Sequence, residues 1–128
     1  MIVAGVGSKR GVSAADVLAA LDAALERVGL AREAVKVVAT PAVKGGEVGI
    51  AEAAALLGLP LVLVPQGQLE AMADQTLTHS DRVVALLRVP SAAETAALAA
   101  CGPDAQLLGP RLALGSVTCA LARSGKTP

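Results

Sequence analysis

A glycine-rich loop near the start of the sequence holds the residue types best suited to bind an anionic ligand. Residues 5–11 read Gly-Val-Gly-Ser-Lys-Arg-Gly, which combines a flexible backbone with a hydroxyl and two cations. A helix predicted to begin directly after the loop would add free amides and a partial positive charge, so the loop suits a carboxylate or a phosphate. The alternative is a tight turn whose cations are solvated. The substrate-binding candidates of this loop are Gly7, Ser8, Lys9, Arg10 and Gly11.

A second loop, at residues 40–47, offers a hydroxyl, a cation and an acid. Thr40 ends a predicted strand, and Lys44 and Glu47 follow it. If the strands that precede the two loops are neighbours in a parallel sheet, the loops meet at one sheet edge. We therefore predict that Thr40 and Lys44 bind substrate, and we treat Glu47 as a candidate acid or base. The alternative is a surface ion pair between Lys44 and Glu47, which would contribute little energy.

His79 is the second candidate for catalysis, because it is the single histidine and histidine exchanges protons near neutral pH. The alternative is an ordinary surface residue. No second His, Cys or acid stands at a ligand-like spacing from it, so we predict no metal site. No spacing indicates a nucleophile paired with a base, and enzymatic activity therefore stays an open question.

The sequence also predicts no nucleotide cofactor. The glycine spacing of the first loop is close to the dinucleotide-binding fingerprint, but the second predicted strand ends at Thr40 where that fingerprint needs an acid. No Gly-Lys-Ser or Gly-Lys-Thr follows the first strand, so the P-loop signature is missing too. We expect no cofactor at this site, with nucleotide binding as the less supported alternative.

The elements that must position these loops alternate between strands and helices. Apolar strands are predicted at residues 2–7, 35–40 and 61–64. Between them lie a helix capped by Ser13 and ended by Gly29, and a helix over residues 47–57 ended by Gly58. Apolar strands that alternate with helices are typical of a mostly parallel sheet covered on both faces.

The second half of the chain predicts three short helices and two final strands. The helices lie at residues 68–73, after Ser80, and from residues 90–91 to Gly102; the strands lie at 106–108 and 115–122 and should pair antiparallel. The predicted fold is therefore a three-layer α/β/α domain with a mixed, mostly parallel sheet and a C-terminal antiparallel strand pair. We expect one domain at residues 1–123 and a flexible tail at 124–128.

The composition of the chain argues against two classes of protein, those that bind nucleic acid and those that span a membrane. The 11 basic and 11 acidic residues balance, and Phe, Tyr and Trp are absent, which argues against a nucleic-acid partner. Gly, Pro or charge interrupts every apolar stretch, so no membrane span is expected. No secretory signal precedes the first strand, and we expect reduced, mostly buried thiols at Cys101 and Cys119 in a cytoplasmic protein, with a disulfide between them as the less supported option.

Three longer motifs stand in order along the chain. They are Gly-Val-Gly-Ser-Lys-Arg-Gly-Val-Ser-Ala at residues 5–14, Ala-Thr-Pro-Ala-Val-Lys at 39–44 and Gly-Ser-Val-Thr-Cys-Ala-Leu-Ala at 115–122. In this order they resemble the CobE family, which is equivalent to the carboxy-terminal domain of CbiG. Gly-Leu-Pro-Leu at 58–61 and Val-Pro-Ser-Ala-Ala-Glu at 89–94 fall between them in the expected order, so the resemblance spans nearly the whole chain.

The resemblance implies a role in cobalamin (vitamin B12) biosynthesis. We expect a protein that binds a precorrin, a polycarboxylate tetrapyrrole, as an accessory or carrier, because cations and helix N-termini suit its acetate and propionate groups. The first alternative is a hydrolase acting on a (cobalt-)precorrin-5A-like lactone, the activity of CbiG, for whose other domain this chain has no room. The second is a scaffolding or regulatory subunit for other corrin-pathway enzymes. A homodimer, in which a second copy of the chain is the partner, is a further possibility.

Overall fold

One mixed six-stranded sheet organises the protein in a computed structural model that describes residues 1–44 and 47–125. Its order is β3-β2-β1-β6-β4, and β5 pairs with β6. β1, β2 and β3 run parallel to one another, whereas β6 runs antiparallel to β1, β4 and β5. The antiparallel part is thus larger than one C-terminal strand pair. The strands are β1 Ile2–Ser8, β2 Val35–Pro41, β3 Leu61–Val64, β4 Gln106–Leu107, β5 Leu112–Leu114 and β6 Val117–Arg123.

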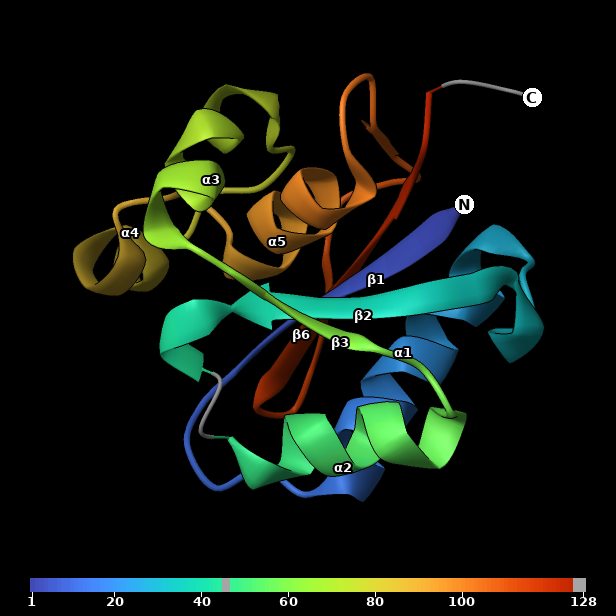
Figure 1. The fold of residues 1–128 in the computed structure, drawn as a ribbon. Coiled ribbons are helices and arrows are strands. Elements are labelled where there is room, and N and C mark those ends of the chain that lie inside the picture. The colour runs from blue at the N-terminus through green and yellow to red at the C-terminus, as the bar shows by residue number, and fades with distance from the viewer. Residues whose placement is uncertain (45–46, 126–128) are drawn as a thin grey trace.

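Helices cover both faces of the sheet, which confirms the three-layer α/β/α prediction (Figure 1). α1 Ala14–Val28 and α2 Val48–Leu57 lie on one side, and α3 Gln66–Ala71, α4 Asp81–Leu87 and α5 Ala92–Cys101 lie on the other. Short 3₁₀ turns lie at Arg32–Ala34, Ala42–Lys44 and Ala73–Gln75. Within the described ranges, no single helix is long and apolar enough to cross a membrane; α4 and α5 reach that composition only together, across a bend of 60°.

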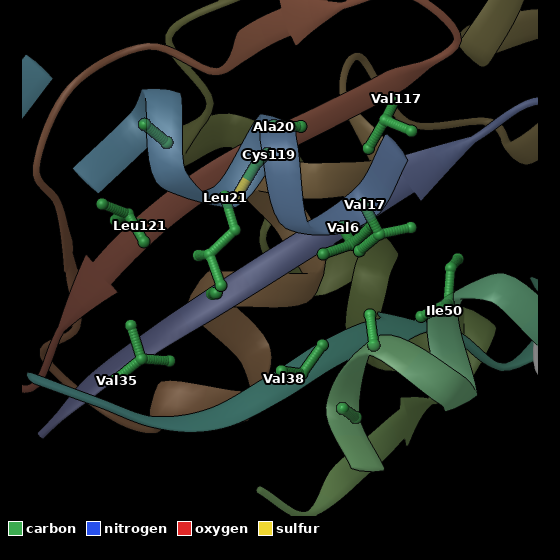
Figure 2. Packing of buried hydrophobic residues seen from close by; sticks show 14 of the residues in the cluster. Val6, Val17, Ala20, Leu21, Val35, Val38, Ile50, Val117, Cys119 and Leu121 are labelled. Carbon is green, nitrogen blue, oxygen red and sulfur yellow. The ribbon is translucent and has the colours of Figure 1, made fainter. Parts of the chain in front are cut away.

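α1 begins and ends as its sequence predicts. The Ser13 hydroxyl accepts the Asp16 N–H and the Asp16 carboxylate accepts the Ser13 N–H, which makes a capping box, and Gly29 ends the helix in the left-handed conformation at φ 72°. The apolar side chains between these caps repeat at helical spacing. They pack on the sheet, as Figure 2 shows for Val17 and Leu21 beside Val6.

α5 lies unusually close to β1 because a glycine of the strand faces alanines of the helix where the two elements meet. A Cβ atom added to Gly5 would stand 2.0 Å from the Ala93 carbonyl oxygen and 2.8 Å from the Ala97 Cβ. Only glycine on the strand, facing alanine on the helix, permits this approach. The result is an alanine-rich core on this face of the sheet.

Several predicted boundaries differ from the structure by one or two residues, and two differences in the second half of the chain go further. The helix expected at residues 68–73 begins two residues earlier, at Gln66 directly after Pro65, and it gives way to a 3₁₀ turn. The connection expected between the final strands contains an additional strand, β5, which pairs with β6. A three-residue strand next to Gly and Pro gives too short an alternation to be recognised from sequence.

The two ends of the described chain are joined beside the start of β1. The Met1 ammonium donates to the Ser124 hydroxyl at 3.1 Å, and the Ser124 N–H donates to the Met1 carbonyl at 3.0 Å. Ser124, the first residue of the predicted flexible tail, is therefore held in place. Residues 126–128 of that tail lie outside the described residues.

Candidate functional site

The candidate site forms where β1 ends and β6 begins. Because these strands are antiparallel, Gly7 pairs with Thr118 and Ser8 with Val117, and the Lys9 N–H continues the ladder to the Ser116 carbonyl at 3.0 Å. The glycine-rich loop after β1 therefore lies beside the turn that leads into β6. The turn after β2 and α4 lie at the same end of the sheet, at the left of Figure 1.

These segments surround a cavity of about 590 Å³, which is within the usual range for a small-molecule site. It draws on six separate parts of the chain, from the first strand to the last. The lining residues are Gly7, Ser8, Lys9, Arg10, Val43, Ser80, Arg82, Val83, Leu86, Leu87, Ala92, Arg111, Gly115, Ser116 and Thr118.

The cavity is cationic. Lys9 and Arg10 from the glycine-rich loop face the same space as Arg82 of α4 and Arg111 before β5. All but the half-buried Arg111 are exposed, and the lining residues given above include no carboxylate. Positive charges gathered around one concave surface attract anionic ligands and raise their local concentration.

The other part of the lining is aliphatic. Val43 and Leu86 stand at the rim with 67% and 65% of their surface exposed, and Val83, Leu87 and Ala92 continue the apolar surface inward. Exposed branched side chains beside a hollow are typical of a binding surface rather than of a core. A ligand that matches this lining has acidic groups around an apolar body.

The cavity wall leaves little space around Gly7. A Cβ there would stand 2.9 Å from the Thr118 hydroxyl oxygen, and that hydroxyl already donates to the Gly7 carbonyl at 3.3 Å. The Ser8 hydroxyl is covered by its neighbours and has no hydrogen-bond partner within the described part of the chain. The loop therefore contributes mainly backbone and cations to the accessible surface.

Comparison with known proteins places the chain in a family. A family model described as "Cobalamin synthesis G C-terminus" matches residues 2–122. The chain belongs to this family. It is a cobalamin biosynthesis protein of the CobE and CbiG C-terminal type, as its motif order predicted.

Solved structures of this family share its fold. CobE, from the cobalamin (vitamin B12) biosynthetic pathway, is 30% identical with a TM-score of 0.92, over 96% of this chain and 89% of its own. The cobalamin biosynthesis protein chiG from Agrobacterium tumefaciens is 39% identical with a TM-score of 0.79, over 98% and 100%. A putative cobalamin biosynthesis protein G homolog from Sulfolobus solfataricus is 25% identical with a TM-score of 0.73, over 94% of this chain but 36% of its own. No curated protein matches.

The structure brings four of the predicted binding residues of this family member into the cavity, namely Gly7, Ser8, Lys9 and Arg10. Gly11 lies outside the lining and makes the turn at φ 79°, a conformation that favours glycine. Its N–H donates to the Glu47 carboxylate at 2.9 Å. Glu47, predicted as an acid or base, thus ties the two loops together from outside the cavity.

The remaining candidates lie elsewhere. Thr40 is fully buried and its hydroxyl donates to the Val6 carbonyl at 2.7 Å, so it joins β2 to β1 rather than facing the cavity. The Lys44 side chain lies outside the described part of the chain. His79 is 62% exposed, contacts the Asp81 carboxylate at 2.9 Å and does not line the cavity.

Sequence reasoning missed Arg82, Arg111 and the apolar surface of α4. Neither arginine stands in a motif. Arg111 reaches the cavity because β5, which follows it, pairs antiparallel with β6, whereas Arg82 is carried there by α4. The signal available was the turn at Gly115, since antiparallel pairing of the final strand with the first would place that turn beside the glycine-rich loop. Within residues 1–44 and 47–125, no three His, Cys, Asp or Glu side chains gather as metal ligands would.

Proposed function

We propose that this protein binds a precorrin intermediate in the cationic cavity and acts as an accessory or carrier protein of cobalamin biosynthesis. The observation that supports the proposal is the lining, which combines four cations with an aliphatic surface and, among its residues, has no acid. Precorrins present the complementary chemistry, since carboxylates surround an apolar macrocycle. Arginine binds such carboxylates through two parallel hydrogen bonds.

The residues that line the cavity favour a carrier role over catalysis. Neither of the two candidates for acid and base catalysis lines it: Glu47 accepts the Gly11 N–H, and His79 is at the surface beside Asp81. The described lining residues include no histidine and no carboxylate, the side chains that most often serve as the general base in hydrolysis. The exposed rim at Leu86 would leave part of the macrocycle open to the next corrin-pathway enzyme.

The cytoplasm is the proposed location. The structure has free thiols at Cys101 and Cys119, which belong to the cores on opposite faces of the sheet and so do not pair. Unpaired, buried thiols are usual in a reducing compartment.

Titration with uroporphyrin tests the proposal, because this stable tetrapyrrole bears an acetate and a propionate on each ring and reports binding by its fluorescence. We expect a dissociation constant in the range of about tens of micromolar or tighter. Arg82→Ala and Arg111→Ala should each weaken binding about fivefold, the effect of removing roughly 1 kcal/mol of charge interaction. Arg123→Ala, an exposed arginine on β6 away from the lining, is the matched control and should bind as the wild type.

The outcomes separate the alternatives. No spectral change at those concentrations, or equal losses in all three arginine variants, would refute binding at this cavity. Conversion of a precorrin-5A-like lactone by the purified protein would favour the hydrolase. Co-purification of a corrin-pathway enzyme without any uroporphyrin binding would favour the scaffold.

A further inference from the structure

Glu94 is a buried carboxylate that the proposed site does not use directly. It lies in the first turn of α5 with none of its surface exposed, and the Ser91 hydroxyl that caps this helix accepts its N–H at 3.2 Å. Taking a carboxylate out of water is costly unless hydrogen bonds compensate for the lost hydration. A carboxylate at this buried position therefore requires several hydrogen-bond donors.

Each oxygen of Glu94 binds a different loop. Oε1 accepts the N–H groups of Leu77 and Thr78 at 2.8 and 3.0 Å, and Oε2 accepts the Arg111 N–H at 2.8 Å. All three donors are backbone amides outside the helices and strands. Bonds from N–H groups to a charged acceptor are stronger than neutral ones, and the N-terminal end of a helix also favours negative charge.

Both loops lead directly into the cavity. Ser80 and Arg82, which line it, follow Thr78 by two and four residues, and Arg111 is itself a lining residue. α4, which carries Arg82, begins at the Ser80 cap, and its single buried residue is Leu87. The position of this cavity wall therefore depends strongly on how the segment before α4 is held.

We propose that Glu94 is a positioning residue that presets two cationic walls of the cavity by holding the loops at residues 77–78 and 111 on one carboxylate. The ligand then meets Arg82 and Arg111 already in place and need not order them. Such preorganisation increases affinity without any contact between Glu94 and the ligand. The claim that Glu94 raises ligand affinity rests on the proposed function, whereas the claim that Glu94 restrains the two loops does not.

Amide hydrogen exchange of the wild type is the first test, and it needs neither a variant nor a ligand. The amides of Leu77, Thr78 and Arg111 should exchange at least about tenfold more slowly than that of His79 in the same irregular region, since each makes a hydrogen bond to a charged group. Exchange of all three as fast as His79 would overturn the proposal. This result stands even if the wild type fails to bind uroporphyrin, which would refute only the proposed function.

Glu94→Gln is the second test, because an amide has a single acceptor oxygen and can serve only one of the two loops. We expect exchange to speed up about tenfold in one loop and uroporphyrin binding to weaken by about the same factor, while α5 and the sheet stay protected. Faster exchange throughout the protein would instead mean a general loss of stability. If this variant does not fold, the wild-type exchange result still decides whether Glu94 holds the loops.

Two control variants separate positioning from stability. Ser91→Ala removes the cap of the same helix but leaves the Glu94 carboxylate in place, so it should lower the melting temperature with uroporphyrin affinity unchanged. Glu52→Gln makes the same chemical change at an exposed position of α2 and should alter neither property. Equal weakening of binding in Ser91→Ala and Glu94→Gln would show a general stability effect and would refute the positioning role.

Discussion

The close approach of α5 to β1 makes Gly5→Ala the sharpest test of how this fold is built. The new methyl group would stand 2.0 Å from the Ala93 carbonyl oxygen, whereas ordinary contact begins near 3.4 Å. The first turn of α5 must therefore retreat by roughly 1.4 Å, the difference between these distances. Backbone atoms of Ala93 and Ala97 form this obstacle, so no flexible side chain can move aside to accommodate it.

We expect this change to lower the free energy of unfolding by about 3 kcal/mol, the upper range for overpacking, since α5 also loses contacts along the sheet. For a domain of this size the melting temperature should fall by about 10 °C. Gly67→Ala is the matched control, because nothing lies within 4 Å of a Cβ at this position of α3. It should raise stability by about 0.5 kcal/mol, since alanine favours a helix.

Thermal unfolding followed by circular dichroism measures both variants under one set of conditions. A Gly5→Ala protein that melts with the wild type would refute the packing argument, because it would mean that α5 can move without cost. Equal losses at Gly5 and Gly67 would refute it as well, by pointing to a general intolerance of the substitution.

Two further predictions concern buried polar groups. Thr40→Val removes the hydroxyl that donates to the Val6 carbonyl, so the free energy of unfolding measured in urea titrations should fall by about 1 kcal/mol. The affinity for uroporphyrin should stay the same. Weaker binding by this variant would mean that Thr40 contributes to ligand binding after all. Burial raises the pKa of Cys119 to about 12 from 9.0, so the folded thiol stays protonated where the unfolded one ionises. Ionisation of this thiol in the unfolded state should therefore lower the free energy of unfolding by about 1.4 kcal/mol per pH unit as pH rises above 9. Urea titrations at about pH 8 to 10.5 measure this slope, which should be smaller for Cys119→Ala. An identical slope in the variant and the wild type would contradict the raised pKa of Cys119.

Local signals predicted much of this fold. Ser13, Gly29 and Gly58 mark helix boundaries by their own chemistry, and the structure confirms all three. The meeting of the two predicted loops followed from parallel pairing of neighbouring strands, which is a general property of such sheets. Features that depend on a few neighbouring residues, or on a rule of topology, are accessible from one sequence.

Features that depend on distant parts of the chain were not accessible. Glu94 stands in an alanine-rich helix, where a charge would ordinarily indicate a solvated face, yet it is fully buried because three distant amides bind it. Arg82 and Arg111 look like any surface cations until the sheet brings them to one cavity. Their roles arise from tertiary contacts that no spacing in the sequence encodes.

The pairing of Met1 with Ser124 has a consequence for how such a domain fits into larger proteins. Both residues stand at the end of β1 opposite to the cavity, about 20 Å away along the seven-residue strand. A polypeptide joined before Met1 or soon after Ser124 would therefore meet the domain on the side away from the cavity. This arrangement agrees with the Sulfolobus solfataricus homolog, of which the matching region makes up 36%. A fold with adjoining ends can be inserted into a longer chain as a module while the cavity at its other end stays open.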